Sequence, residues 1–192
     1  CSIVNGTWNY GIVDFIASND IDLVLIGEQA TIFGKKELLA NPDFIAEKAN
    51  VPVITVPPNR HLNKLYCIVI PVTDFLPVKK LVYGIYMAYN LDCTIKLLGI
   101  ENAGTARQVQ HYLKKAACLI KENCDVKVET DTIVSSNVAD AVHKFAISES
   151  ADLIIVNPGT QTKMPGLFSS LFNKVIQKYS LPPVLTVNPV YH

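Results

Sequence analysis

Short apolar runs alternate with amphipathic stretches along most of the chain. Apolar runs of strand length predict strands in its second part at residues 66–72, 94–100, 126–134, 152–156 and 184–187. Between them, apolar residues recur at helical spacing and predict helices at 78–90, 105–123 and 167–179. A further helix is predicted to begin after Asn137, which would cap its N-terminus. Because strands and helices alternate, this part is predicted to be a doubly wound α/β domain with a parallel sheet covered on both faces.

The first part of the chain carries the same kinds of pattern over a shorter length. Strands are predicted at residues 2–4, 22–26 and 53–56, and helices at 10–18 and 41–49. Asn41 and Pro42 are expected to begin the second of these helices, because asparagine caps helix N-termini and proline fits the first turn. This part therefore has the elements of half a domain.

Two segments of the chain repeat each other. IDLVLIGEQA at 21–30 is matched by ADLIIVNPGT at 151–160, and PVITVPP at 52–58 is matched by PVLTVNP at 183–189. The offset is 130 residues between Asp22 and Asp152 and 131 residues between Pro52 and Pro183. A period of this length indicates a duplicated domain rather than a solenoid.

The repeat predicts the domain organisation. Residues 1–57 are expected to be the C-terminal half of a first domain, 58–64 a proline-containing linker, and 65–192 a complete second domain. If the copies share one length, about 65 residues of the first copy are missing ahead of Cys1. Either those residues precede this chain in the native protein, which is the preferred interpretation, or a second polypeptide takes their place.

Composition narrows the range of functions. Hydrophobic residues make up 49% of the chain and charged residues 18%, which is enough apolar material for a sizeable core. The formal net charge is zero and no basic face is visible, so nucleic acid is not an expected partner. No apolar run approaches the roughly 20 residues of a membrane helix. The five cysteines lack metal or redox spacing and are expected to be free thiols in a reducing compartment.

Three ordered motifs in this chain resemble those of the universal stress protein family. The first predicted strand ends in Thr73-Asp74-Phe75, the fourth reads Asp-Leu-Ile-Ile-Val-Asn at 152–157, and the last reads PVLTV. The second and third motifs recur in the first copy as DLVLIG and PVITV. The chain is thus similar to a tandem two-domain universal stress protein whose first domain is truncated at its N-terminus.

The resemblance implies a particular fold. Members of the family have a five-stranded parallel sheet of order 3-2-1-4-5, in a Rossmann-like, adenine nucleotide alpha hydrolase-like arrangement. Here the sheet would be built from residues 65–187 and preceded by a half copy of the same domain.

The resemblance also implies a nucleotide loop, which this chain carries in altered form. The family pattern is Gly, two residues, Gly, nine residues, then Gly-Ser or Gly-Thr. Asn157 and Thr160 stand at the first two glycine positions, and Ser169-Ser170 stand at the closing pair. Each lost glycine adds a Cβ where backbone has to approach phosphate.

Two interpretations of this region follow. In the first, which is preferred, the segment from Asn157 to Ser170 is a connecting loop with a serine cap on the last helix. In the second, it forms an ATP site in which Asp74 with Thr73 holds the adenosine and Ile100 packs on the base. The remaining candidate ligands, for ribose and phosphates, are Asn157, Gly159, Thr160, Ser169 and Ser170.

The predicted function is that of a non-enzymatic, cytoplasmic stress-response module with a degenerate nucleotide loop, which acts by association rather than turnover. No catalytic residue, metal site or cofactor is expected. The alternative is an ATP-binding member, with Mg²⁺, that hydrolyses slowly or gates signalling. A regulatory part of a larger protein is the third possibility.

The resemblance also implies self-association through the last strand of each copy, since members of the family often dimerise by pairing these strands. Unpaired apolar edge strands favour pairing, so Val53–Val56 and Val184–Val187 are predicted to pair as a pseudo-dimer within one chain. Within the half copy, the two missing strands would leave a gap between the strands predicted at 2–4 and 22–26, which would expose Ile3, Phe15, Leu23 and Leu25.

Isolated polar residues are given ordinary structural roles. Lys79-Lys80 is expected to be a solvated pair, and Asp74 with Thr73 is a possible cap for the following helix. His111 and His143 are expected at the surface or its boundary, since no nucleophile motif accompanies them.

Overall fold

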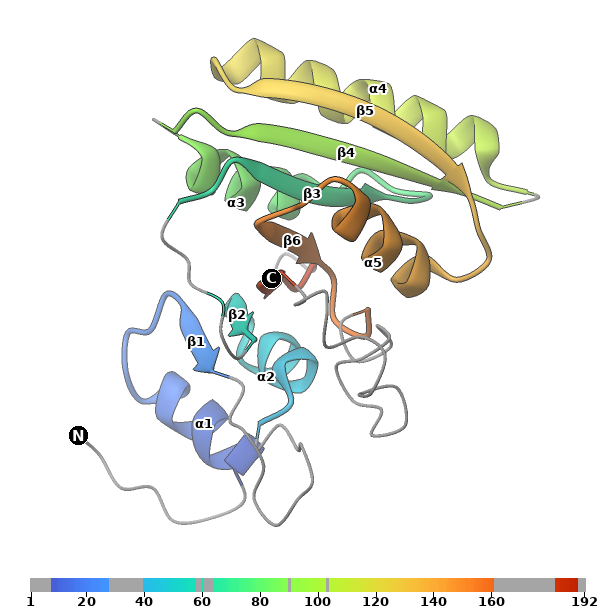
Figure 1. Ribbon diagram of the computed structural model, residues 1–192. Helices are drawn as coiled ribbons and strands as arrows, with labels where there is room; N and C mark the ends of the chain where they lie inside the picture. Colours follow the sequence, from blue (N-terminus) through green and yellow to red (C-terminus); the bar gives the residue numbers. More distant parts are fainter. Residues whose placement is uncertain are drawn as a thin grey trace.

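One seven-stranded sheet runs through the computed structural model, with helices against both of its faces (Figure 1). The structure describes residues 8–27, 40–57, 60, 64–89, 91–102, 104–160 and 182–189. The strands lie in the order β1-β2-β7-β6-β3-β4-β5. Their bounds are β1 Val24–Gly27, β2 Val53–Val56, β3 Cys67–Val72, β4 Thr94–Glu101, β5 Lys127–Val134, β6 Leu153–Val156 and β7 Val184–Thr186.

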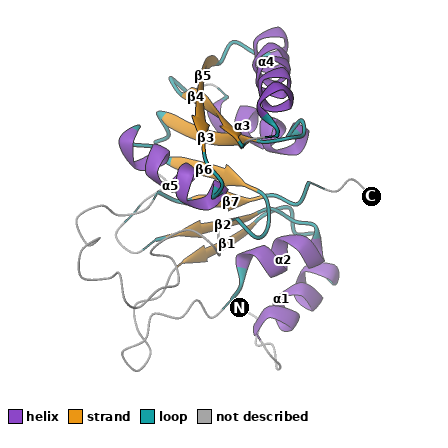
Figure 2. Ribbon diagram, turned by 90° about the vertical axis from the view of Figure 1, so that its right-hand side faces the viewer, coloured by secondary structure: helices purple, strands orange, loops and turns teal. Residues whose placement is uncertain are grey.

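The helices of the second part enclose its strands. Their bounds are α3 Val78–Ala88, α4 Ala106–Asn123 and α5 Val138–Ser148. Helices α3 and α4 lie on one face of the sheet and α5 lies on the other (Figure 2). Strand β3 is consequently buried at all of its positions. Ile68 and Ile70 belong to the core beneath α3 and α4, whereas Val69 belongs to the core beneath α5, as strand alternation requires.

The number of strands differs from the prediction. Five strands were expected, but the sheet continues beyond β7 into β2 and β1. Strands β5, β4, β3, β6 and β7 are parallel neighbours, and in that order they correspond to strands 3-2-1-4-5 of the second part. Strand β2 then adds to the edge of β7, because an apolar edge strand is stabilised by a hydrogen-bonded partner.

The pairing of the two last strands is present within the chain. Strand β2 runs antiparallel to β7, with Val53 opposite Thr186, Ile54 opposite Leu185 and Thr55 opposite Val184. Ile54 and Leu185 both belong to the core beneath α3 and α4. The first and second parts of the chain are therefore joined by a shared sheet and a shared core.

The first part has its own small core. Helices α1 (Trp8–Ala17) and α2 (Pro42–Ala49) pack beside β1 and β2, and Ile16, Ile45 and Val53 are buried between them. The predicted cap of α2 is confirmed, since the Phe44 N–H donates to Asn41 Oδ1 at 3.1 Å. The strand predicted at 2–4, with Ile3, lies outside the described residues, as do most of the linker and the helix predicted at 167–179.

Asp152 shows what the repeated Asp-Leu motif does structurally. Its carboxylate Oδ2 accepts from the N–H groups of Tyr66 and Cys67, at 2.8 and 3.0 Å, and so holds the beginning of β3 against β6. The equivalent residue of the first copy, Asp22, precedes β1 at the end of the strand order and is exposed.

Apolar side chains are exposed on β1, just before it and on α1. Leu25 is 63% exposed, Leu23 40% and Phe15 37%. Strand β6, by contrast, is buried at all of its positions.

In the part of the chain that the structure describes, no helix is long and apolar enough to span a bilayer.

Candidate functional site

The candidate site lies where the chain reverses its direction of progress across the sheet. From β3 the chain moves to β4 and β5 on one side, and then returns to β6 on the other side of β3. The crevice outside the carboxyl ends of the strands at such a switch point is where open α/β sheets bind ligands. Thr73 follows β3 at this place, and Asn157 follows β6.

A cavity of about 700 Å³ occupies this switch point. Its volume is within the range of small-molecule binding pockets. Four segments line it: the end of β3, the start of α3, the loop into α5 and the loop after β6. The described lining residues are Pro71, Thr73, Lys80, Ser136, Asn137, Val138, Ala139, Asn157, Pro158, Gly159 and Thr160.

Lys80 is the charged group of the cavity. Its residue is only 4% exposed, and its Nζ donates to the carbonyl oxygen of Pro71 at 2.7 Å. Burial disfavours the ammonium form and lowers the pKa of Lys80 to about 7. The expectation that Lys80 belongs to a solvated pair is therefore wrong.

The periodicity of α3 contains the signal that sequence reasoning missed. The buried residues of this helix include Lys80, Gly84 and Ala88, which are spaced by four and share one face. Gly84 lies against Ile70 of β3, so this face is the one turned toward the sheet. A lysine in register with a buried glycine and alanine lies on the core side of the helix.

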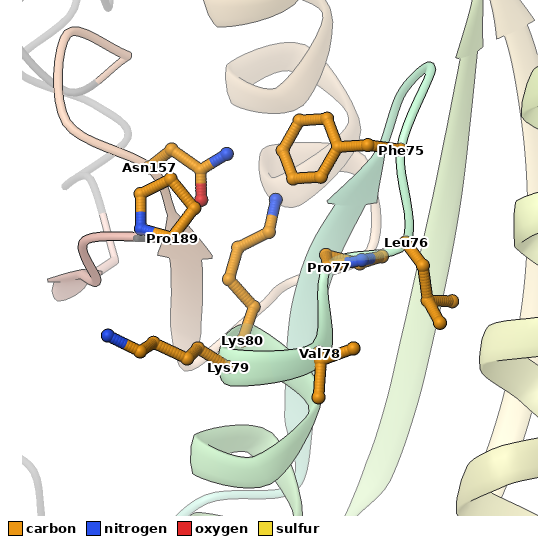
Figure 3. A pocket seen from close by; sticks show the side chains of 8 residues that line it. All are labelled: Phe75, Leu76, Pro77, Val78, Lys79, Lys80, Asn157 and Pro189. Atoms are coloured by element: carbon orange, nitrogen blue, oxygen red, sulfur yellow. The ribbon is translucent and has the colours of Figure 1, made fainter. Parts of the chain in front are cut away.

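Asn157 contributes an acceptor without a partner. Its Oδ1 is buried and has no hydrogen-bond partner among the described residues. Figure 3 shows the Lys80 side chain between Asn157 and Phe75 in a smaller pocket of about 50 Å³, which shares Lys80 and Asn157 with the lining of the larger cavity. Buried polar atoms are usually satisfied, so this oxygen marks a place for a donor that the protein does not supply.

The loop after β6 turns sharply at Gly159. The N–H of Thr160 donates to the carbonyl of Asn157 at 3.2 Å, and Gly159 has φ +79°, in the left-handed region that glycine adopts readily. A Cβ on Gly159 would meet nothing within 4 Å, so its conformation rather than its space calls for glycine.

The N-terminus of α5 forms the opposite wall. Asn137 Oδ1 accepts from the N–H of Asp140 at 3.1 Å, which confirms Asn137 as the cap. The Oγ of Ser135 accepts from the Asn137 N–H, also at 3.1 Å, and fixes the approach of the chain to the helix. Sequence reasoning gave Asn137 a capping role but did not bring it to the site.

The predicted site residues separate into three groups. Thr73, Asn157, Gly159 and Thr160 meet at the cavity. Asp74 is exposed and Ile100 is buried in the core beneath α5, and neither is among the described lining residues. Ser169 and Ser170 lie outside the described residues.

Two minor expectations are corrected. The N-cap of α3 is Pro77, with no side-chain capping bond, so Thr73 and Asp74 do not cap that helix. His143 is 5% exposed rather than at the surface, because it lies on the buried face of α5, and burial lowers its pKa.

The chain has the fold of universal stress proteins. A universal stress protein from Archaeoglobus fulgidus superposes with a TM-score of 0.63 over 93% of this chain, at 15% identity. This chain spans 65% of that protein's length. A universal stress protein in complex with cAMP superposes with a TM-score of 0.50 over 67% of this chain and 100% of its own, at 18% identity. No family model matches the sequence, and no curated protein gives a significant sequence match.

Proposed function

We propose that this chain is a non-enzymatic stress-response module of the universal stress protein type, whose state depends on binding a nucleotide in the switch-point cavity. The observation that carries the proposal is the cavity of about 700 Å³ at the carboxyl ends of β3 and β6, lined by hydroxyl, amide and ammonium groups. These groups suit the recognition of a polar, anionic ligand. The complex of one structural neighbour with cAMP supports an adenine nucleotide as the first ligand class to test.

The altered loop sets the expected strength of binding. Asn157 and Thr160 replace glycines of the family pattern, so fewer backbone N–H groups approach the phosphates without steric hindrance. We therefore expect micromolar rather than nanomolar binding, and an association or conformational response rather than turnover.

Titration calorimetry with adenosine, AMP, cAMP and ATP tests the proposal. We expect AMP or ATP to bind the intact chain, and Asn157→Leu to weaken binding because it removes the unpaired acceptor and fills space at the cavity. Asn19→Leu is the matched control, since Asn19 is exposed in the first part of the chain. Absence of binding by all four compounds at millimolar concentration would contradict the proposal.

The second candidate is an ATP-binding module that hydrolyses slowly or gates signalling. The cation of Lys80 at the cavity favours it, because phosphoryl groups require positive charge nearby. Chromatography of ATP after long incubation with the protein separates the two candidates. ADP formation above the level of an Asn157→Leu sample would favour the second; ATP recovered unchanged after binding would favour the first.

A further inference from the structure

We propose that Lys80 is the group that binds the ligand's phosphate, so that binding needs no metal ion. The inference rests on the proposed function, since it names the chemistry of the same cavity. Phosphate binding would then depend on α3 as well as on the loop after β6.

The position of Lys80 is the first support. Its residue is 96% buried, and its side chain extends from α3 to the ends of the strands, where it lines the cavity (Figure 3). Among the described residues, Nζ makes one hydrogen bond, to the Pro71 carbonyl. An ammonium group has three N–H donors, so two remain for a ligand.

The lack of a counter-charge is the second support. Burial is the sole cause of the lowered pKa of Lys80, with no contribution from a carboxylate. Of the charged groups on the surrounding elements, Asp74 after β3 is exposed, Lys79 on α3 bonds Asn50, and Asp140 on α5 pairs with Lys144. A buried cation without a partner is costly, so an anion that enters the cavity is strongly favoured.

Proton uptake follows from these two facts. In the ligand-free chain Lys80 is part neutral at neutral pH, because its pKa is about 7. A phosphate oxygen beside Nζ favours the charged form and raises that pKa again. The same ligand can satisfy Asn157 Oδ1 with a hydroxyl donor, so a nucleoside phosphate fits both groups.

The experiment compares AMP with adenosine, each with and without EDTA, in the wild type, Lys80→Met and Lys114→Met. Methionine keeps the length of Lys80 without its charge, and Lys114 is an exposed lysine of α4 that serves as the control. We expect Lys80→Met to weaken AMP binding about tenfold or more and to leave adenosine unchanged. Wild-type affinity for AMP should fall about tenfold from pH 7 to pH 8.5, as the free amine becomes neutral.

Proton uptake is read directly in two ways. Calorimetry in buffers of different ionisation enthalpy should show a fraction of a proton absorbed per AMP at pH 7.5. In ¹³C-lysine spectra, the Lys80 signal, assigned by its loss in Lys80→Met, should titrate at higher pH with AMP than without it.

Three results would overturn the inference. If AMP binds equally to Lys80→Met and Lys114→Met, Lys80 is not the phosphate ligand, although the proposed function stands. If AMP binds to the wild type without proton uptake, the amine is already charged in the free chain and the proton step is wrong. If EDTA abolishes AMP binding, a metal ion has the role assigned to Lys80. If neither adenosine nor AMP binds, the inference and the proposed function both fail.

Discussion

At the scale of single residues, the unusual feature of this chain is a lysine placed in the interior. Lys80 is 4% exposed and places its amine on the core face of α3. A charge in such a position destabilises the folded chain unless it is neutralised or paired. A residue that opposes folding is retained more readily when it serves a ligand.

Lys80→Met should stabilise the ligand-free chain in a pH-dependent way. Lys80 has a folded pKa of about 7 against an ordinary value of 10.5, so between these values the unfolded state binds the extra proton. Stability of the wild type therefore rises with pH across this window. We expect Lys80→Met to have the higher melting temperature at pH 6.5, with the difference shrinking by pH 9.5. Thermal unfolding followed by circular dichroism measures the melting temperatures, with Lys114→Met as control. A difference in melting temperature between wild type and Lys80→Met that does not change with pH would show that Lys80 is not buried as a charge.

At the scale of elements, α5 combines a structural and a site role at one end. Its buried face covers β3 and β4, while its capped N-terminus forms a wall of the cavity. Helix α2 has the same kind of cap, but in the first part of the chain. Removing the cap of each helix in turn therefore separates the effect of a lost cap on stability from the effect of a disturbed cavity wall on ligand binding.

Asn137→Ala and Asn41→Ala should each destabilise the chain by about 1 kcal/mol, because each leaves an N-terminal N–H without its acceptor. Urea unfolding measures both effects. We expect only Asn137→Ala to change nucleotide affinity in calorimetry, and Asn137→Ser to restore stability by restoring the cap. Equal effects of the two alanine variants on affinity would indicate a general loss of structure rather than a site at α5.

At the scale of the whole molecule, the antiparallel contact of β2 and β7 makes two repeats into one sheet. This edge is the one that an α/β domain of this order leaves open, and here β2 of the first part of the chain covers it. Leu185 is fully buried at the contact and lies opposite Ile54. Loss of packing at this contact should therefore destabilise both parts of the chain.

Leu185→Ala should lower the free energy of unfolding by about 2–5 kcal/mol, since it leaves a cavity in a shared core. Hydrogen exchange should accelerate in β1 and β2 as well as in β6. Ile16→Ala, in the separate core of the first part, is the comparison and should affect α1 and α2 most. Unchanged protection of β1 and β2 in Leu185→Ala would show that the two parts fold independently.

The order of elements and the pairing of the repeats could be read from the sequence because they depend on local patterns. The continuous apolar run of β3 indicates a strand buried on both faces, and the Asp-Leu and Pro-Val repeats align the two copies. Thr73 and Asn157 follow strands, and the carboxyl ends of parallel strands share one edge, so their convergence was predictable as well.

The contents of the site depended on contacts between segments far apart along the chain. A lysine pair at the start of a helix gives no local sign of its surroundings; Lys80 becomes buried because β3, β6 and the loop after β6 enclose the end of α3. Asp74 follows Thr73 directly along the chain but is exposed to solvent, and Ile100, at the end of β4, is buried in the core. Periodicity reports which face of an element is covered, whereas the chemistry of a cavity is set by which loops the crossovers bring together.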